Sequence, residues 1–367
     1  MTEMVRAERK KILSKRSTVT LFFISIIIIV IYFILFIFSY RNVYYDYENG
    51  IMKSVGGYES IEQRKAIANL FTGELTQDTL SLIQNKLAIA DNATFDKDET
   101  TQFSAHHVYR DQKTLLDFMT NENGSFKTIA EAYPNSTAIL LGYCDGWDNM
   151  LSSMGEVLSI LVCLIITISI SPVFAEEYVY HTDSVICSAR YGKNKLVVAK
   201  ILASIQVMVG IYGIYLLFHI LLFGCIYGFN GWGVSIQSSL HYGNSTYALT
   251  FGQLFLSAIC LNLLGIITLT VITLFISAKM HSPVSALILA CVVCFLPVFF
   301  DFTDNISFFQ KIQEVCPIFL LNVNTVFAKA KQHAGLDQPI IMTAINGALI
   351  VIFYILTKHA CRNHQVT

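Results

Sequence analysis

The sequence predicts an all-α membrane protein with six transmembrane helices and a mainly helical extracellular domain between the first two of them. Hydrophobic residues make up 54% of the chain and charged residues only 14%, whereas about a quarter of the residues of a soluble domain are charged. The apolar residues gather in runs of about 20, the length that one helix needs to cross a bilayer. Lysine and arginine flank these runs mainly on one side, as in membrane proteins whose basic loops face the cytoplasm.

The first predicted transmembrane helix covers residues 19–39, which contain no charged residue and follow a basic segment, residues 1–18. The run is too long for the apolar core of a signal peptide, and no small-residue cleavage site follows it. We therefore expect an uncleaved span. A five-helix transmembrane domain is predicted over residues 151–357, with spans at Gly155–Phe174, Lys200–Tyr227, Phe251–Ser277, Pro283–Phe300 and Pro339–Thr357.

The distribution of basic residues predicts that both termini are cytoplasmic. Six lysines and arginines precede the first span, and four more lie between the second and third spans. The tail, residues 358–367, is basic as well. The connections on the other side are acidic, neutral or mixed, so the positive-inside rule orients the chain in the cell (plasma) membrane.

Residues 40–150 form the extracellular segment and are numerous enough for a small folded domain. Paired histidines, His106 and His107, raise the question of a metal site, but adjacent side chains point apart and a solvated surface is the favoured interpretation. No metal site is expected. Apolar residues at helical spacing predict helices at Ser60–Phe71, Thr76–Ala90 and Asp111–Thr120, and a helical turn at Thr128–Tyr133.

Several classes of function lack their motifs. No G-x-x-x-x-G-K-[ST] loop is present, so the chain is not expected to be an enzyme or to hold a cofactor. The net charge of −1 and the lack of a basic stripe argue against a nucleic-acid partner. Ion-coupled pumps place ionisable residues inside the membrane, and here the spans contain few polar candidates. These are His219, interpreted as an interhelical histidine; Asn262, interpreted as a contact between helices; and Glu156, Glu176 and Glu177, which are expected at span edges.

The loop between the second and third spans is where a partner would supply energy. Glu176 and Glu177 end the second span, and an amphipathic helix with Val179, Val185 and Ile186 on one side follows. Gly192, flanked by basic residues, then breaks the helix before the third span. Such a surface helix is either a docking surface or an anchor at the membrane interface.

This loop resembles the first cytoplasmic loop of permease subunits in ABC transporters of the type-2 exporter class. Those permeases have Phe-x-x-Glu at the end of the second span, then a short helix, a glycine-containing turn with basic residues, and a third span that begins at a lysine. The matching positions are Phe174, Glu177, Thr182, Arg190, Gly192, Lys195 and Lys200. The resemblance implies a coupling helix at about residues 178–189 that rests in a groove of a separate ATPase subunit. The implied ATPase-coupling residues are Phe174, Glu176, Glu177, Val185, Ile186, Arg190, Gly192 and Lys195.

The resemblance covers most of residues 155–357 and implies a re-entrant segment at 306–327. It also implies a second permease subunit, identical or different, with ATP bound by the partner ATPase. The chain departs from compact family members in its long extracellular segment, which leaves the substrate open. The apolar spans suit an amphipathic substrate, such as a peptide, a drug or a lipid-like molecule. The alternative function is a membrane receptor or sensor with an extracellular ligand domain; an intramembrane enzyme lacks a paired Asp, Ser–Lys or His–Glu arrangement at membrane depth.

Overall fold

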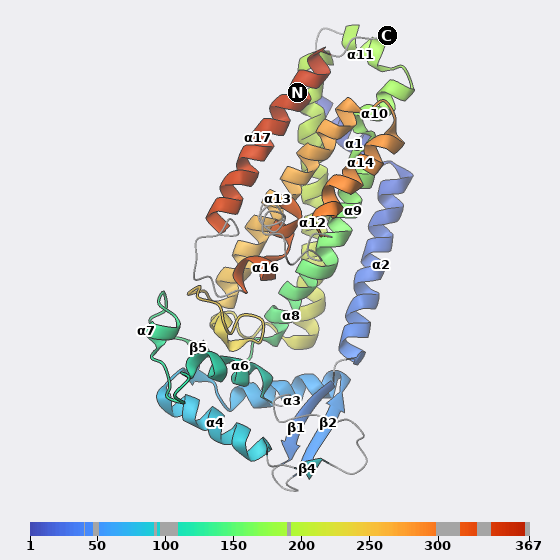
Figure 1. Ribbon diagram of the computed structural model, residues 1–367. Coiled ribbons are helices and arrows are strands. Elements are labelled where there is room, and N and C mark those ends of the chain that lie inside the picture. Colours follow the sequence, from blue (N-terminus) through green and yellow to red (C-terminus); the bar gives the residue numbers. More distant parts are fainter. Residues whose placement is uncertain are drawn as a thin grey trace.

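The computed structural model describes residues 1–39, 41–46, 51–91, 94–95, 109–188, 192–298, 316–328 and 339–363. The chain forms a long helical bundle with a smaller domain at one end, which we call the distal domain, residues 41–144 (Figure 1). The N-terminus and the last turns of helix α17 (Pro339–Asn363) lie at the opposite end, which we call the proximal end.

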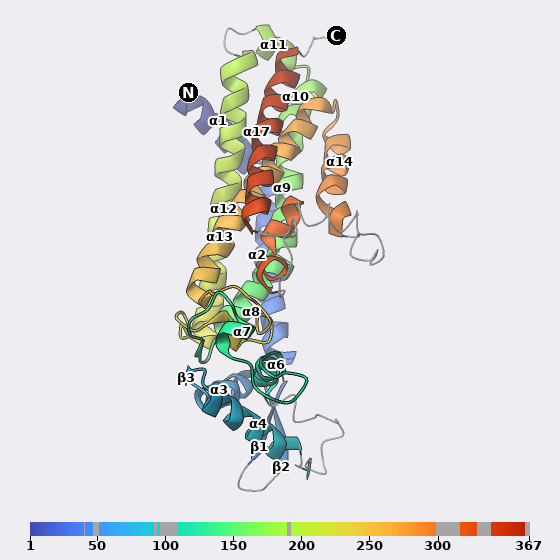
Figure 2. The ribbon, with the colours of Figure 1, turned by 60° about the vertical axis from the view of Figure 1, so that its left-hand side comes forward.

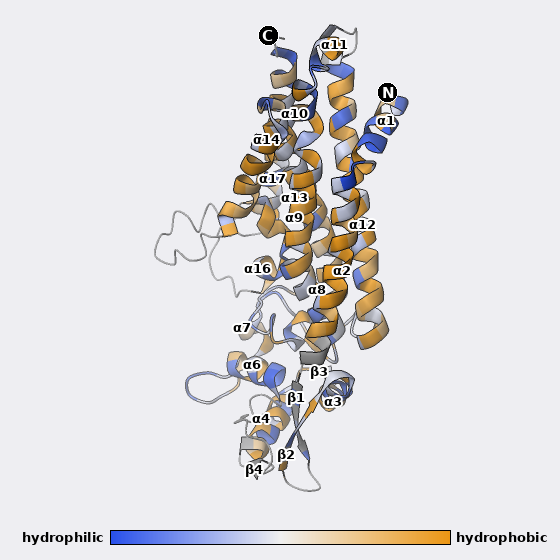
Figure 3. Cartoon of the chain, turned by 90° about the vertical axis from the view of Figure 1, so that its right-hand side faces the viewer, coloured by the Kyte–Doolittle hydropathy of each residue, from blue (hydrophilic) through white to orange (hydrophobic). Residues whose placement is uncertain are grey.

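Among the described residues, five helices are long and apolar enough to cross a membrane. They are α2 (Arg16–Ser39); a continuous helix made of α8 (Asp145–Ser153), η1 (Met154–Leu158), α9 (Ser159–Ile170) and α10 (Pro172–Val179); α12 (Val197–Tyr227) with the preceding turn η2 (Gly192–Leu196); α13 (Phe251–Lys279); and α17. A shorter apolar helix, α14 (Pro283–Phe295), lies where the fifth span is predicted. Hydrophobic residues cover these helices along most of their length (Figure 3). The prediction of a mainly helical protein with several apolar, membrane-compatible helices is therefore confirmed.

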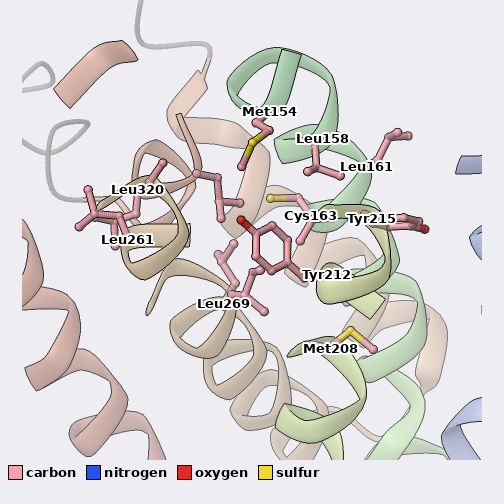
Figure 4. Packing of buried hydrophobic residues seen from close by; sticks show 14 of the residues in the cluster. Met154, Leu158, Leu161, Cys163, Met208, Tyr212, Tyr215, Leu261, Leu269 and Leu320 are labelled. Atoms are coloured by element: carbon pink, nitrogen blue, oxygen red, sulfur yellow. The ribbon is translucent and has the colours of Figure 1, made fainter. Parts of the chain in front are cut away.

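Helix α13 is at the centre of the bundle and packs against α9, α12, α14 and α17. Figure 4 shows side chains from three of these helices meeting around Cys163, with Tyr212 and Leu269 beside it. The backbone of Gly265 on α13 comes close to Pro317, because a Cβ atom at Gly265 would lie 3.0 Å from the Pro317 carbonyl oxygen. Small residues of this kind let helices in membranes approach closely.

Two short elements precede α17, the 3₁₀ turn η5 (Pro317–Leu321) and helix α16 (Val323–Phe327). They lie alongside the bundle rather than beyond its end, with η5 against α13 and α9 (Figure 1). Most of their apolar side chains are buried. Irregular backbone at membrane depth has to be enclosed by protein in this way. Residues 306–315 of the predicted re-entrant segment lie outside the described residues.

The distal domain contains the predicted helices, each within about three residues of its predicted bounds. They are α3 (Gly57–Asn69), α4 (Gln77–Asp91), α6 (Arg110–Met119) and α7 (Ile129–Ala132). The predicted start of α4 is confirmed because the Thr79 backbone N–H donates to the Thr76 hydroxyl at 3.2 Å. His106 and His107 lie outside the described residues.

Strands in the distal domain were not anticipated. An antiparallel hairpin pairs β1 (Arg41–Asp46) with β2 (Ile51–Gly56), so that Arg41 faces Gly56. A short strand, β4 (Thr94–Phe95), runs parallel to β2, and β3 (Gly73–Glu74) pairs antiparallel with β5 (Leu140–Leu141). The domain is therefore mixed, with helices covering short strands.

The basic N-terminal segment is also more ordered than the sequence indicated. Residues Thr2–Leu13 form helix α1, which packs along the proximal half of α12 (Figure 2). Val5 and Ile12 are buried in this contact. The hydrophilic residues of α1 distinguish it from the apolar α2 that follows (Figure 3).

Candidate functional site

The segment between the second and third long helices forms the tip of the proximal end (Figure 1). Helix α10 ends in a pair of backbone hydrogen bonds, Thr182 N–H to Glu177 O at 3.0 Å and His181 N–H to Tyr178 O at 3.2 Å. His181 has a φ of 53°, the left-handed conformation that closes such helix ends. The chain therefore turns sharply before the six-residue helix α11 (Asp183–Ser188). The predicted coupling helix at 178–189 is shorter than expected, since Tyr178 and Val179 belong to α10.

Helix α10 is attached to α13 at the point where proline interrupts the long second helix. Pro172 has no N–H and disturbs the helical hydrogen bonds around it. The buried hydroxyl of Ser277 on α13 accepts from the backbone N–H groups of Phe174 at 2.9 Å and Ala175 at 3.2 Å. The Tyr178 hydroxyl donates to Ala278 O at 3.0 Å. The end of α10, which leads into α11, is thus attached to the fourth long helix.

Gly192 allows the other end of the loop to close on α11. A Cβ atom at Gly192 would overlap the backbone carbonyl of Ile186. Only glycine permits this approach without moving backbone atoms. Helix α11 and the start of the third long helix are therefore held in direct backbone contact.

A buried ion network lies beneath α11 and joins three segments of the chain. The Lys200 side chain is only 1% exposed, and its Nζ lies 2.7 Å from Glu177 Oε1 and 3.0 Å from Glu8 Oε2. Lys11 Nζ is 3.4 Å from Glu177 Oε1, and Lys15 pairs with Glu176. A buried ammonium is tolerated when carboxylates surround it in this way. The network ties α1 to α10 and α12.

Helix α1 is the part of this site that sequence reasoning missed. A signal was present, because Val5, Glu8 and Ile12 recur at the three- and four-residue steps that place side chains on one helical face. The buried Val5 and Ile12 face α12 and the core, while Glu8 reaches Lys200. The pattern identifies an amphipathic helix but not the helix that it meets.

The structure separates the predicted ATPase-coupling residues into two groups. Phe174 and Glu177 are buried and face the bundle, with Lys200 Nζ 5.7 Å from the centre of the Phe174 ring. Glu176 is half-buried in its ion pair. Val185 is 70% exposed at the tip, and Ile186 lines a small pocket with Phe174 and Gly192. Lys195 is exposed, and Arg190 lies outside the described residues.

Exposed apolar side chains also occur at the end of α10, five and six residues before Val185. Tyr180 is also 70% exposed, and Val179 is 49% exposed. We call Val179, Tyr180 and Val185 the tip patch. Sequence reasoning placed Val179 and Val185 on this helix surface but did not identify Tyr180, whose aromatic ring at the α10–α11 turn was a usable signal.

A second ionic cluster joins the distal domain to the bundle. Arg64 on α3 pairs with Asp111 on α6 and, through Nε at 2.8 Å, with Asp145 at the start of α8. His241 Nδ1 lies 2.9 Å from Asp148 Oδ2, one helical turn further along. Burial raises the pKa of Asp111, and the Arg64 guanidinium opposes that shift. The hydrogen bond to Asp148 raises the pKa of His241.

Two polar residues inside the bundle, His219 and Asn262, make the contacts predicted for them. His219 Nδ1 is 3.0 Å from Tyr215 O, and its other ring nitrogen is 3.4 Å from the Ser153 hydroxyl, as expected for an interhelical histidine. The Asn262 amide lies 2.9 Å from the Tyr212 hydroxyl, which links α13 to α12. Glu156, expected at a span edge, lies within the second long helix, which begins at Asp145.

No protein-family model, curated protein sequence or solved structure matches the chain. Its function is therefore inferred from the residues and contacts described above.

Proposed function

We propose that the chain is the transmembrane permease subunit of an ATP-driven exporter of the type-2 ABC class. It would move an amphipathic substrate with energy supplied by a separate ATPase subunit. The observation that supports this proposal best is the tip patch, which lies on a short turn and helix whose base is fastened to several long helices at once. In this arrangement the proximal end is cytoplasmic and the distal domain is extracellular.

The tip patch has the properties of a protein docking surface. Two of its side chains, Tyr180 and Val185, are 70% exposed although both are large and apolar. Figures 1 and 2 place α11 beyond the ends of α10 and α13, at the tip of the proximal end. Clustered apolar side chains in such a position mark sites of protein contact. The expected partner is an ATPase with an apolar groove.

The connections beneath the tip patch would carry a displacement into the membrane part. Movement of α11 reaches α10 through the hydrogen bonds at Glu177 and Tyr178 and reaches α12 through Gly192. Ser277 passes it to α13, and Lys200 passes it to α1. Packed helices respond to such a push by shifting between two arrangements. Two permease subunits would enclose the substrate path. Within each subunit, α14 would be the fifth span, and η5 and α16 would form the end of the re-entrant segment.

The proposal is tested with the tip patch itself. The affinity-tagged chain, isolated from its native membrane in mild detergent, is expected to carry a P-loop ATPase with it. The double variant Tyr180→Ser/Val185→Asp should abolish this association and export while leaving the chain folded. Tyr58→Ser is the matched control, because Tyr58 is similarly exposed at 59% but lies in the distal domain. If the double variant still associates with the ATPase and still exports substrate, the proposal is wrong.

The ionic cluster of the distal domain favours a second candidate, a membrane receptor. Arg64 and Asp145 connect α3 directly to the start of the second long helix, so a ligand bound outside could move that helix. A receptor would bind a ligand with the distal domain and would associate with a signalling protein instead of an ATPase. The same pull-down distinguishes the two functions, because a captured kinase in place of an ATPase favours the receptor.

A further inference from the structure

The cations of the N-terminal segment fall into two groups. Lys11 and Lys15 point toward the bundle and pair with the two glutamates near the end of α10. The second group, which we call the arginine group, consists of Arg6, Arg9 and Arg16, and all three side chains are exposed. None of these arginines forms an ion pair or a side-chain hydrogen bond with the described residues. The lysines therefore serve the ion network, and the arginines are available to another molecule.

Helical spacing places two of these arginines on one side of α1. Arg6 and Arg9 are three residues apart, and Leu13 follows four residues after Arg9, so their side chains are neighbours on the helix surface. Val5 and Ile12 are buried against α12 and the core from the adjoining face. Helix α1 thus has a packed face and an outward face, and the outward face combines cations with an exposed leucine.

The arginine group directly adjoins an apolar helix. Arg16 is the first residue of α2, and the stretch without charge, residues 19–39, begins three residues later. Leu13 and Val19, on either side of Arg16 in the chain, are 46% and 42% exposed. Basic residues interleaved with exposed apolar ones are typical of helices at a membrane surface. Figure 2 shows α1 on the flank of α12, apart from the tip that carries α11.

Positive charge exceeds negative charge in this segment. Residues 1–18 contain six lysines and arginines and two glutamates. Glu8 is already paired with the buried Lys200, and Glu3 can offset only one further charge. The undescribed stretches that adjoin the proximal end, residues 189–191 and 364–367, contain no aspartate or glutamate. The excess charge of the arginine group therefore favours an anion from outside the chain. Guanidinium groups match phosphate oxygens in particular, because they donate two parallel hydrogen bonds.

We infer that Arg6, Arg9 and Arg16 bind the headgroups of anionic phospholipids in the membrane leaflet that α2 enters at its N-terminal end. The guanidinium groups would pair with the phosphates, and Leu13 would contact the upper part of the acyl chains. Clusters of basic residues beside a membrane helix attract anionic lipid, by about fivefold in affinity for each residue. An acidic surface of a partner protein fits less well, because the arginine group lies on the flank beside α2 and not at the tip.

Headgroup binding would also hold α1 in its place. The outward face of α1 would contact lipid while Glu8 meets Lys200, with the Glu8 Oε2 atom 3.0 Å from Lys200 Nζ. A ligand that binds only the folded state raises stability. Anionic lipid should therefore stabilise the proximal end, which gives a second readout besides binding itself. The inference goes beyond the proposed function and needs only that α2 crosses the membrane.

Lipid binding by the purified full-length chain tests this inference. In maltoside micelles the chain is titrated with phosphatidylglycerol or with phosphatidylcholine of the same acyl chains, and native mass spectrometry counts the bound lipids. We expect the wild-type chain to prefer phosphatidylglycerol. Each single Arg→Gln change in the arginine group should weaken phosphatidylglycerol binding about fivefold, and the triple variant about a hundredfold. Phosphatidylcholine binding should not change. Glutamine favours helix nearly as well as arginine does, so α1 should stay folded.

Arg362→Gln is the matched control for Arg9→Gln. Arg362 is an exposed arginine in the last turn of α17, at the same end of the protein but on the other side of α12 (Figures 1 and 2). It should leave phosphatidylglycerol binding unchanged. Phosphatidylglycerol should also raise the unfolding midpoint of the wild-type chain and of Arg362→Gln more than that of the triple variant.

Three outcomes would overturn the inference. The wild-type chain would show no preference for phosphatidylglycerol, the triple variant would bind it as well as the wild type does, or Arg362→Gln would weaken binding as much as Arg9→Gln. Inorganic phosphate is the remaining arm. If it displaces the lipid where chloride of the same ionic strength does not, the arginines bind free phosphate, and the lipid assignment is wrong.

The ATPase pull-down separates this inference from the proposed function. The triple variant should retain the ATPase, since the tip patch is unchanged. Loss of the ATPase with unaltered phosphatidylglycerol binding would assign the arginine group to the partner protein and would overturn the inference. Selective phosphatidylglycerol binding without any ATPase partner would refute the exporter and leave the lipid site standing.

Discussion

Lys200 Nζ lies 2.7 Å from Glu177 Oε1 in the interior of the protein, with a second carboxylate, Glu8, 3.0 Å away. The two residues stand on either side of the loop that carries the tip patch. Their pairing closes that loop at its base, as Gly192 closes it above. The tip is thus supported by a charge network and by a direct backbone contact.

Removing one member of this buried pair should destabilise the protein strongly. Lys200→Met leaves Glu177 and Glu8 without their shared cation, and loss of one partner of a buried pair costs about 3–5 kcal/mol. Thermal unfolding in detergent should therefore show a lower midpoint for Lys200→Met and for Glu177→Gln. The double variant Lys200→Met/Glu177→Leu should lose less than the sum of the two single losses, because Glu177 is then no longer left as a buried charge without its cation and only Glu8 is. Strictly additive losses would contradict the pairing.

Gly192→Ala should disconnect the tip without unfolding the bundle. The new methyl group overlaps the Ile186 carbonyl, so α11 has to move away from the third long helix. We expect faster proteolysis at the α10–α11 turn and loss of ATPase association, with little change in the unfolding midpoint. Gly210→Ala is the control, because nothing lies within 4 Å of a Cβ atom there. Equal behaviour of the two variants would show that the close approach has no role.

Ser277→Ala should weaken the attachment of α10 to α13. The backbone N–H groups of Phe174 and Ala175 would lose a buried acceptor next to Pro172, and an unsatisfied buried donor costs about 1–3 kcal/mol. The unfolding midpoint in detergent should fall accordingly. Ser257→Ala on the same helix is the control, because its exposed hydroxyl bonds only within its own helix, to Gln253 O. A similar small effect in both variants would argue against the attachment.

The contact between His241 and Asp148 should weaken as the pH rises. The pKa of His241 is raised in the folded protein, first by its hydrogen bond to Asp148. A histidine whose pKa is raised by folding stabilises the folded state when it is protonated. This stabilisation is complete below the pKa of the unfolded state, about 6.5, and is lost as the pH rises through the higher pKa of the folded state. Arg110 and Asp111 also face this imidazole and shift its pKa in opposite directions.

Tryptophan fluorescence can follow this titration. The chain contains two tryptophans, and the rings of Trp147 and Trp232 meet 4.9 Å apart next to Asp148. We expect their emission and the unfolding midpoint of the distal end to change between pH 6 and pH 8. His241→Gln should remove that change, whereas exposed His181→Gln at the other end should retain it. A pH response that persists without His241 would contradict the assignment.

Most of the fold was predictable because its main signals are local. Runs of apolar residues and flanking charges identify the long helices, and helical spacing identifies α3, α4 and α6. The β1–β2 hairpin was missed because its strands are short and are stabilised by pairing with each other, which spacing within one strand does not reveal. The start of the second long helix was missed because Asp145 and Asp148 look like a solvated loop. They enter the helix since Arg64 and His241, far away in the sequence, neutralise them.

The candidate site was predictable in its position but not in its construction. Phe174, Glu177 and Gly192 were identified as coupling residues, and Val185 lies at the exposed tip. Glu177 faces Lys200 and Glu8 rather than a partner protein because α1 packs on α12. The sequence of α1 shows only an amphipathic pattern and does not indicate this packing.

The ion network also bears on how the protein is assembled during synthesis. Helix α1 and Glu177 leave the ribosome before Lys200. Glu8 and Glu177 therefore lack their shared cation until the third long helix is inserted. The N-terminal helix then docks on a surface made almost 200 residues later in translation. Insertion of the third helix is therefore the event that completes the proximal end, and nascent chains stopped before it should expose α1 to protease.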